Sequence, residues 1–348
     1  MKNKTIKINK ISSVLKNIHL SDQVEISAQM NSKEGDVLVV KVLQEQDKYG
    51  QLELTNGLMS KIKKDELIVG VLGERKALAG IVGIVPKDIK TGDVLNVLNI
   101  GGVIGRAVSW NKDFVDSPIP VKVLGEVIVN NKNLNIHDYI QKLDSSLTKT
   151  APLIIVMGTA MNVGKTTAAI NIIAALTKKL KLNVAAAKLT GIAAQKDILA
   201  MKKAGASQVL SFLDVGISST INNHGLVVPA AKTIINKLTK GKPNLIIVEL
   251  GDGIIGWYGV EKLLSDKEFS KAMSFNIMCA HDLVGAKGSY DMLKSLNLKI
   301  DFFVGPVSNN TAGIDYLENI LKIPAQDLRY DTKKFLQVLK KKGVIKYD

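Results

Sequence analysis

The chain has 348 residues, of which 46% are hydrophobic and 23% charged, and this is the composition of a globular protein with room for about two domains. Cys279 is its single cysteine, which excludes an intramolecular disulfide and favours a cytoplasmic location. No run approaches the roughly 20 apolar residues that cross a membrane, and the basic start is not followed by the apolar segment of a secretory signal. We therefore expect no membrane partner.

The net charge of +15 raises the question of nucleic acid as a partner. Only Arg75, Arg106 and Arg329 among the 47 basic residues are arginines, the residue best suited to forked contacts with phosphates and bases. Aromatic residues for base stacking make up 5% of the chain, and the lysines are scattered along it. We expect solvated lysine-rich surfaces and no nucleic-acid partner, although the charge can attract small anionic substrates.

The segments on either side of the first predicted domain are polar. Residues 1–32 mix charges with apolar residues at helical spacing, such as Ile11, Leu15 and Ile18, which predicts an N-terminal arm or a short helix. Residues 131–150 are polar and rich in lysine, and they are predicted to form one amphipathic helix and a linker. The domain boundary is expected between residues 146 and 152.

Between these segments, residues 33–130 form a series of short β-rich runs separated by glycine and proline. No helical period is present, so a small β-barrel or β-sandwich is predicted. The Gly-Asp pairs at 35–36 and 92–93 each precede a valine-leucine run and are a weak sign of internal duplication. Arg75 and Arg106 lie in glycine-rich neighbourhoods, and two interpretations stay open: surface arginines in turns, or arginines that face a nucleotide site.

From residue 151 to 348, apolar runs alternate with segments of helical spacing. The runs are LIIVMG, NVAAAKLTG, NLIIVELG, FNIMCAHD and DFFVGPV. Strands this apolar are buried on both faces, and the alternation predicts an α/β fold with a parallel sheet and right-handed crossovers. Because ligands of such sheets lie beyond the carboxyl ends of the strands, the polar residues at those ends are the candidates for a site.

The first run leads into GTAMNVGKTT, which has the strand, turn and helix of a phosphate-binding (Walker A) loop. Backbone N–H groups of the turn and the helix dipole would hold phosphate oxygens, Lys165 would reach the β and γ phosphates, and the Thr166 hydroxyl would coordinate Mg²⁺. The alternative is a helix start with a purely packing role. The residues expected to bind nucleotide in this loop are Thr159, Asn162, Val163, Gly164, Lys165, Thr166 and Thr167.

Three further strand ends carry polar residues. Glu249 ends an apolar strand, as does the acidic residue near Mg²⁺ in P-loop proteins, although a carboxylate capping a loop is the alternative. Lys188 ends another apolar strand, so its ammonium must reach an anion or solvent, and Asp197 either caps the next helix or approaches the metal. Asn309 or Asn310, after the last strand, would contact a nucleobase or merely form a turn.

The order of these motifs resembles dethiobiotin synthetase between residues 152 and 310. GTAMNVGKTT resembles its GT-x-T-x-VGKT loop, KLTG is similar to its KPV-x-TG but two residues shorter, the DIL that begins at Asp197 resembles its aspartate-led segment, and ELGDG resembles its EGAGG. The β-rich front domain has no counterpart there. In build, the chain is similar to uncharacterised P-loop proteins with an added N-terminal domain.

The resemblance implies a P-loop NTPase fold and a site that binds ATP, or GTP, together with Mg²⁺. It implies Thr166, Asp197 and Glu249 around the metal, Lys165 and Lys188 on phosphate and carboxylate or carbamate oxygens, and Asn309 near the base. Lys165, Lys188 and Glu249 are then the candidate catalytic residues. Partition and septum-site ATPases carry an extra lysine early in the loop, where this chain has Ala160.

KLTG and ELGDG differ from the synthetase where it holds its diamine substrate, so two functions stay open. The first is an ATP- and Mg²⁺-dependent ligase or phosphotransferase that acts on a small carboxylate or amine. The second is a nucleotide-switch or chaperone ATPase or GTPase whose β-rich domain binds a partner. The sequence also leaves a homodimer open.

Overall fold

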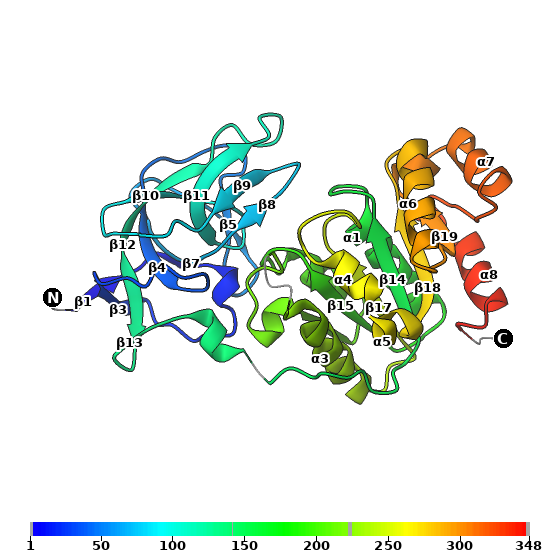
Figure 1. Cartoon of the computed structure of the whole chain (residues 1–348), viewed down its shortest axis with the longest axis horizontal. Coiled ribbons are helices and arrows are strands. Elements are labelled where there is room, and N and C mark those ends of the chain that lie inside the picture. Colours follow the sequence, from blue (N-terminus) through cyan, green and yellow to red (C-terminus); the bar gives the residue numbers. More distant parts are fainter. Residues whose placement is uncertain (1–2, 141, 222–224, 346–348) are drawn as a thin grey trace. The chain divides into compact units, whose positions relative to one another are not determined.

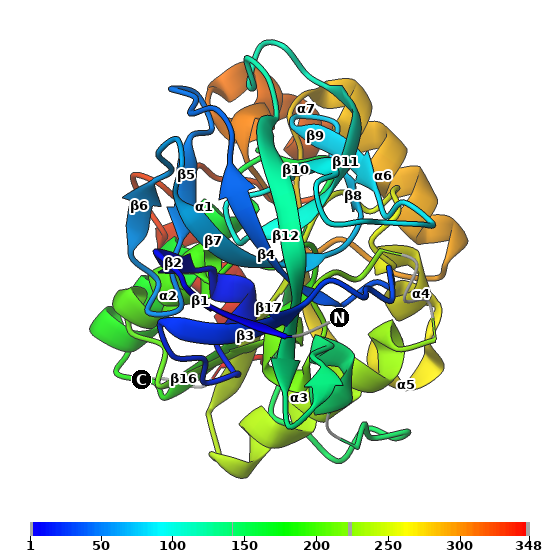
Figure 2. The ribbon, with the colours of Figure 1, turned by 90° about the vertical axis from the view of Figure 1, so that its left-hand side faces the viewer.

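The computed structural model describes residues 3–140, 142–221 and 225–345 (Figures 1 and 2). It divides into two compact units. The β-rich unit comprises Met1–Lys142, Ile192–Lys196 and Leu213–Ile221, and the P-loop unit comprises Leu143–Gly191, Asp197–Phe212 and Asn222–Asp348. The division at Lys142 precedes the boundary expected between 146 and 152. Two short segments that the sequence assigned to the second domain belong to the β-rich unit instead.

The P-loop unit is built on a six-stranded sheet in the order β16-β15-β17-β14-β18-β19. Every neighbouring pair is parallel, which confirms the predicted α/β fold. The strands are β14 (Leu153–Gly158), β15 (Val184–Thr190), β16 (Gln208–Ser211), β17 (Leu245–Leu250), β18 (Met273–Cys279) and β19 (Phe302–Val304). The sequence did not reveal the edge strand β16, because its four residues include only two apolar ones.

Helices cover both faces of this sheet. They are α1 (Lys165–Ala174), α2 (Lys196–Ala204), α3 (Val227–Lys240), α4 (Val260–Ser265), α5 (Lys267–Ala272), α6 (Leu283–Ser295), α7 (Thr311–Asn319) and α8 (Lys333–Lys341), with the single turn η5 (Pro306–Ser308) and a π-helical turn η3 (Ala175–Lys179) that extends α1. The single turn η4 (Phe212–Val215) lies, except for Phe212, in the segment that belongs to the β-rich unit. Within the described residues, none of the helices is both long and apolar enough to cross a membrane.

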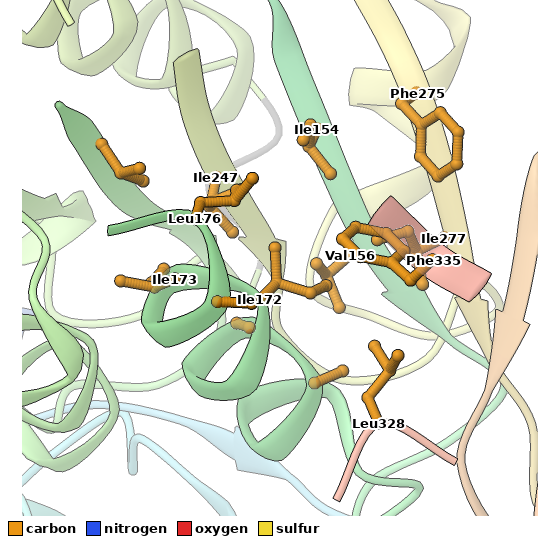
Figure 3. Packing of buried hydrophobic residues seen from close by; sticks show 14 of the residues in the cluster. Ile154, Val156, Ile172, Ile173, Leu176, Ile247, Phe275, Ile277, Leu328 and Phe335 are labelled. Atoms are coloured by element: carbon orange, nitrogen blue, oxygen red, sulfur yellow. The ribbon is translucent and has the colours of Figure 1, made fainter. Parts of the chain in front are cut away.

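All six residues of β14 are buried, and they alternate between the two faces of the sheet. Ile154 and Val156 face a core that α1 and α8 complete, as Figure 3 shows. In this core the Phe335 ring of α8 makes edge contacts with Phe275 and Phe302, with ring centroids 5.9 and 5.4 Å away. The carboxyl end of β14, which carries the phosphate loop, is thus fixed by packing on both sides.

The β-rich unit contains a closed barrel, which confirms one of the two predicted architectures. Its ring of pairings runs β12-β4-β7-β11-β10 and back to β12, and only the β7–β11 pair is parallel. The strands of the unit are β1 (Lys4–Lys7), β2 (Lys10–Ile11), β3 (Gln23–Ser27), β4 (Val37–Val42), β5 (Gln51–Glu53), β6 (Met59–Lys61), β7 (Leu67–Leu72), β8 (Arg75–Lys76), β9 (Ile81–Ile84), β10 (Val94–Val97), β11 (Val103–Trp110), β12 (Ile119–Val129) and β13 (Lys132–Asn133). Alternate residues such as Leu38, Val40 and Val42 fill its interior.

The prediction of an arm or short helix for residues 1–32 is wrong. β1 pairs with β3, β3 pairs with β12, and β2 pairs with β7, so this segment extends the barrel sheet. Helical structure in it is limited to the single turn η1 (Ser13–Leu15). Ile11 ends β2 and Leu15 ends the turn η1, so the apolar residues of a strand and a turn together give a spacing that resembles that of a helix. Strand pairing with distant residues determines the conformation of this segment instead.

The predicted linker helix at 131–150 is also wrong for the residues described. This segment contains β13 and the single turn η2 (Ile136–Tyr139). The chain then follows α3, where Thr148 N and Oγ1 both donate to Asn236 Oδ1, at 2.9 and 2.8 Å. Side chains of α3 thus satisfy backbone groups that a helix would have paired within itself.

The suspected duplication has a counterpart in two turns of the barrel. In the turns 33–36 and 90–93, the aspartate side chain accepts the backbone N–H of the lysine three residues earlier, at 2.7 and 2.9 Å. Gly35 and Gly92 adopt φ values of 92° and 100°, which glycine tolerates best. Each turn starts a strand, β4 or β10, that pairs with β12.

A half-buried glutamate of the β-rich unit should make stability depend on pH. Burial and the charge of Glu74 raise the pKa of Glu34 to about 7. An unfolded chain releases this proton near pH 4.5, so the folded state binds more protons between these values and stability falls as pH rises. We expect Glu34→Gln to reduce the loss of unfolding free energy between pH 5 and 8 by about 1–3 kcal/mol. Thermal unfolding across this range measures it, with the exposed Glu45→Gln as control, and an unchanged slope in Glu34→Gln would contradict it.

Candidate functional site

The phosphate loop connects the end of β14 to the start of α1. Its base is fixed by two backbone hydrogen bonds, Thr159 N to Cys279 O at 2.9 Å and Ile254 N to Gly158 O at 2.8 Å. A Cβ at Gly158 would lie 2.7 Å from the Val163 side chain, so this position requires glycine. The strand, loop and helix predicted from the sequence are present on a parallel sheet, and the chain therefore has a P-loop NTPase fold.

Lys165 begins α1 and is almost fully buried. Its Nζ donates to the carbonyl of Ala160 at 2.7 Å, so the ammonium lies across the loop that it terminates. Burial lowers the pKa of Lys165, and the nearby Glu249 carboxylate opposes that shift. The loop thus holds a buried lysine at the place where a P-loop cradles phosphate.

Four of the predicted site residues meet at the carboxyl edge of the sheet. In the parallel register of β15 and β17, Lys188 lies opposite Glu249. Lys188 Nζ lies 3.6 Å from Glu249 Oε1 and forms a hydrogen-bonded ion pair with Asp197. From α1, Thr166 Oγ1 donates to Glu249 Oε1 at 3.1 Å. The structure therefore brings together the loop threonine, the strand lysine and both carboxylates.

This cluster is charged although it is buried. Glu249 is 1% exposed, and the Lys188 and Asp197 side chains are 15% and 25% exposed. Burial disfavours the Lys188 ammonium, but the Glu249 and Asp197 carboxylates outweigh that effect and hold the pKa of Lys188 above its usual range. The lysine therefore stays protonated and offsets the charge of one carboxylate, while burial raises the pKa of Glu249.

The oxygen atoms of this cluster suit Mg²⁺, which prefers hard oxygen ligands and takes one or two protein carboxylates together with substrate phosphates. Glu249 Oε2 is buried and has no hydrogen-bond partner among the described residues, so one lone-pair set is available to a cation. Within 3–140, 142–221 and 225–345, no three His, Cys, Asp or Glu side chains are placed to hold a metal ion together. A metal here would need the Thr166 hydroxyl and a phosphate besides Asp197 and Glu249.

A pocket of about 170 Å³ lies beside the loop within the P-loop unit. Its lining residues are Asn162, Gly164, Thr167, Ala168, Asn171, Val304, Gly305, Pro306, Asn309, Asp327, Leu328 and Arg329. Of the two asparagines considered for a base contact, Asn309 lines this pocket, whereas Asn310 caps α7 by accepting from Gly313 N at 3.3 Å. The pocket adjoins the start of α1, which is where a base would lie if the loop holds the phosphates.

Two other loop residues have distinct surroundings. The Val163 side chain is 1% exposed and packs in the core, so only its backbone is available to a ligand. Thr159 is half-buried. Its carbonyl lies 2.8 Å from the position that a Cβ on Gly253 would take, so the loop after β17 passes close to the phosphate loop.

The sequence reasoning missed the segment that closes the pocket. Leu328 packs into the core of Figure 3, and the carboxylate of Asp327 accepts from the Arg329 guanidinium at 2.6–3.1 Å. The available signal was composition, because Arg329 is one of only three arginines in a lysine-rich chain.

The other two arginines lie in the β-rich unit. Arg75 is 4% exposed, donates to the carbonyl of Leu98, and lies over the Tyr49 ring at 5.3 Å. Its guanidinium is thus used inside its own unit. Arg106 lies on β11 and is exposed.

Residues of the loop after β18 also have structural partners. Asp282 caps α6 by accepting from Gly285 N at 2.7 Å, and α6 therefore starts at Leu283. Lys287 pairs with Asp291 one turn further along the same helix. These contacts are typical of a capped, solvated helix.

Among the comparisons with known proteins, only the comparison with solved structures finds matches. No family model and no curated protein matches the chain. Similar structures include chloroplast FtsY from Physcomitrella patens (16% identity, 59% of this chain and 72% of that one, TM-score 0.37), the cell division protein FtsY from Thermotoga maritima (15%, 59% and 74%, 0.38) and the signal recognition particle 54 kDa protein from Aeropyrum pernix in complex with GDP (13%, 60% and 52%, 0.37). Likeness at this level carries no functional argument, so function must be argued from the site itself.

The buried cluster yields a stability prediction. Lys188→Met leaves the Glu249 carboxylate without its lysine partner, and breaking a buried ion pair in this way costs about 3–5 kcal/mol. We expect that loss in the unfolding free energy at pH 8, and partial recovery when Glu249→Gln is added, because the uncompensated charge is then gone. Circular dichroism during thermal unfolding measures both.

Lys287→Met is the matched control. It breaks a lysine–aspartate pair of the same unit whose side chains are 47% and 54% exposed, and such pairs contribute about 0.5 kcal/mol. Equal losses in Lys188→Met and Lys287→Met would show that the buried cluster is not held by its charges.

Proposed function

We propose that the P-loop unit is a Mg²⁺-dependent nucleoside triphosphatase that transfers the γ-phosphoryl group to a small carboxylate or amine, as a ligase or phosphotransferase. One observation carries this proposal: Lys188 projects from a strand end into a buried cluster with the metal-type ligands Thr166, Asp197 and Glu249. A packing lysine would extend to solvent. This one is kept charged beside the phosphate loop.

The roles follow from the chemistry of each group. Thr166, Asp197 and Glu249 would hold Mg²⁺, which neutralises charge on the phosphate oxygens when bound. Lys188 brings a fixed positive charge into a site where little water screens it, and Lys165 would add a second charge when its amine is protonated. Fixed charges of this kind stabilise the negative charge that develops on a transferred phosphoryl group.

The acceptor in this proposal is a substrate rather than a protein side chain. Cys279 is fully buried and its pKa is raised to about 12, because burial disfavours the thiolate. His281 is 72% exposed, 3.8 Å from Asp282, and belongs to the helix start rather than to the cluster. The resemblance to dethiobiotin synthetase supports a carboxylate or amine acceptor.

The nucleotide in this proposal is ATP, which the same resemblance supports. The pocket beside the loop also argues for testing GTP. Guanine presents acceptors to an arginine and donors to a carboxylate, and both Arg329 and Asp327 line the pocket.

A second candidate function is a nucleotide switch whose β-rich unit binds a partner. The observation that favours it is the division of the chain: residues 192–196, between Lys188 and Asp197, belong to the β-rich unit. A change at the nucleotide site would then reach the barrel directly. Either function is compatible with a homodimer.

Steady-state turnover of the purified chain tests these functions. We expect ATP or GTP hydrolysis that requires Mg²⁺ and rises when a panel of small amines and carboxylates is supplied. Lys165→Met should lower kcat about 10²–10³-fold, because one preorganised charge on the phosphoryl group is lost. Lys287→Met, on the surface of α6, should retain full turnover.

The outcomes separate the two candidates. Stimulation by a protein, DNA or RNA in place of small molecules would replace the ligase or phosphotransferase with the switch. Absence of Mg²⁺-dependent nucleotide binding would refute both.

A further inference from the structure

We propose that Glu53 and Asn99, in the β-rich unit, are positioning residues for Asp197 and thereby set the affinity of the metal site. This inference rests on the proposed function, because it takes Asp197 as a metal ligand. Both residues lie far from Asp197 in the sequence and act through the segment 192–196, which belongs to their own unit.

The segment precedes Asp197 directly. The chain leaves the P-loop unit after Gly191, belongs to the β-rich unit at Ile192–Lys196, and returns at Asp197 as α2 begins. Two residues of chain span at most about 7 Å, so Asp197 cannot stay in place if Gln195 moves by several ångströms. Whatever fixes Gln195 therefore limits where the Asp197 carboxylate can lie.

Glu53 fixes Gln195. Its Oε2 accepts the backbone N–H of Gln195 at 2.6 Å, and the Gln195 side chain donates to the carbonyl of Thr55 at 2.9 Å. Glu53 is 0% exposed and Gln195 is 7% exposed, so these bonds are shielded from competing water. A buried glutamate at the end of β5 is thus used to hold a backbone amide of a distant segment.

Asn99 fixes the segment two residues earlier. Its Nδ2 donates to the carbonyl of Ala193 at 2.6 Å, while its Oδ1 accepts from Val103 N at 3.0 Å. A Cβ at Gly101 would lie 1.8 Å from the same carbonyl, so only glycine permits this approach. The loop after β10 is therefore shaped around the Ala193 carbonyl.

A second segment of the β-rich unit also holds the backbone of Ile192 and Ala193. Ala193 N donates to Ser218 O at 2.7 Å, and Ile192 and Ser219 form an isolated β-bridge. Both serines belong to the segment Leu213–Ile221 of the β-rich unit. Ala193 thus has its backbone N–H and its carbonyl fixed from two sides, which is more than a connecting loop needs.

The experiment measures metal affinity rather than turnover. Mn²⁺ serves as a paramagnetic substitute for Mg²⁺, and its binding to the full chain with a non-hydrolysable ATP or GTP analogue is followed by electron paramagnetic resonance. We expect Glu53→Ala and Asn99→Ala each to weaken Mn²⁺ binding about tenfold or more, as loss of an outer partner of a metal ligand does. Glu53→Gln keeps an oxygen acceptor for Gln195 N and should restore most of the affinity.

Matched controls come from the same unit. Glu126 is also 0% exposed and accepts a backbone N–H at 2.6 Å, but from Asn31, and Asn96 likewise accepts from Ala107 N at 3.1 Å. Glu126→Ala and Asn96→Ala should therefore perturb the barrel to a similar degree and leave Mn²⁺ affinity within about twofold of the wild type. Circular dichroism checks that every variant is folded.

The results distinguish this inference from the function on which it rests. If the wild-type chain binds Mn²⁺ with the analogue and the Glu53 and Asn99 variants bind it as tightly, or the controls lose as much, the positioning role is overturned and the metal site stands. If the wild type binds no Mn²⁺ with either analogue, the proposed function fails and takes the inference with it. Should Glu53→Ala not fold, Asn99→Ala against Asn96→Ala decides the question.

Discussion

The site depends on one constraint, which is that two carboxylates and a lysine share a buried edge of the parallel sheet. Lys188 lies opposite Glu249 because β15 and β17 pair in parallel, and the same edge receives Thr166 from α1 and Asp197 from the start of α2. Desolvating any one of these charges alone would cost several kcal/mol. The lysine offsets the charge of one carboxylate, and this permits several oxygen atoms and a fixed cation to share a buried edge beside the phosphate loop.

Sequence reasoning located this edge correctly because its signals are local. A run of apolar residues that ends in a single charged side chain identifies Lys188 and Glu249 as strand-end residues, and the loop motif identifies Lys165 and Thr166. The rule that carboxyl ends of parallel strands share one edge then predicts that these residues meet. The barrel was predictable as one of two architectures, a barrel or a sandwich, since residues 33–130 are short β-rich runs without a helical period.

The rest depended on contacts between distant parts of the sequence. Residues 1–32 have spacing that suits a helix, yet β3 pairs with β12 about a hundred residues later, and strand pairing of that kind leaves no local signal. The sequence pattern predicts ordinary connections of an α/β domain at 192–196 and 213–221. Both segments belong to the β-rich unit instead. The pocket segment with Asp327 and Arg329 was missed because it follows no strand that the pattern could identify.

The chain leaves the P-loop unit at two neighbouring places in the sheet. The two segments that belong to the β-rich unit follow β15 and β16, which are neighbours in the sheet, and both begin at or just beyond the carboxyl ends of those strands. The chain thus returns to Asp197 directly from a segment whose backbone is held by Glu53 and Asn99 of the β-rich unit.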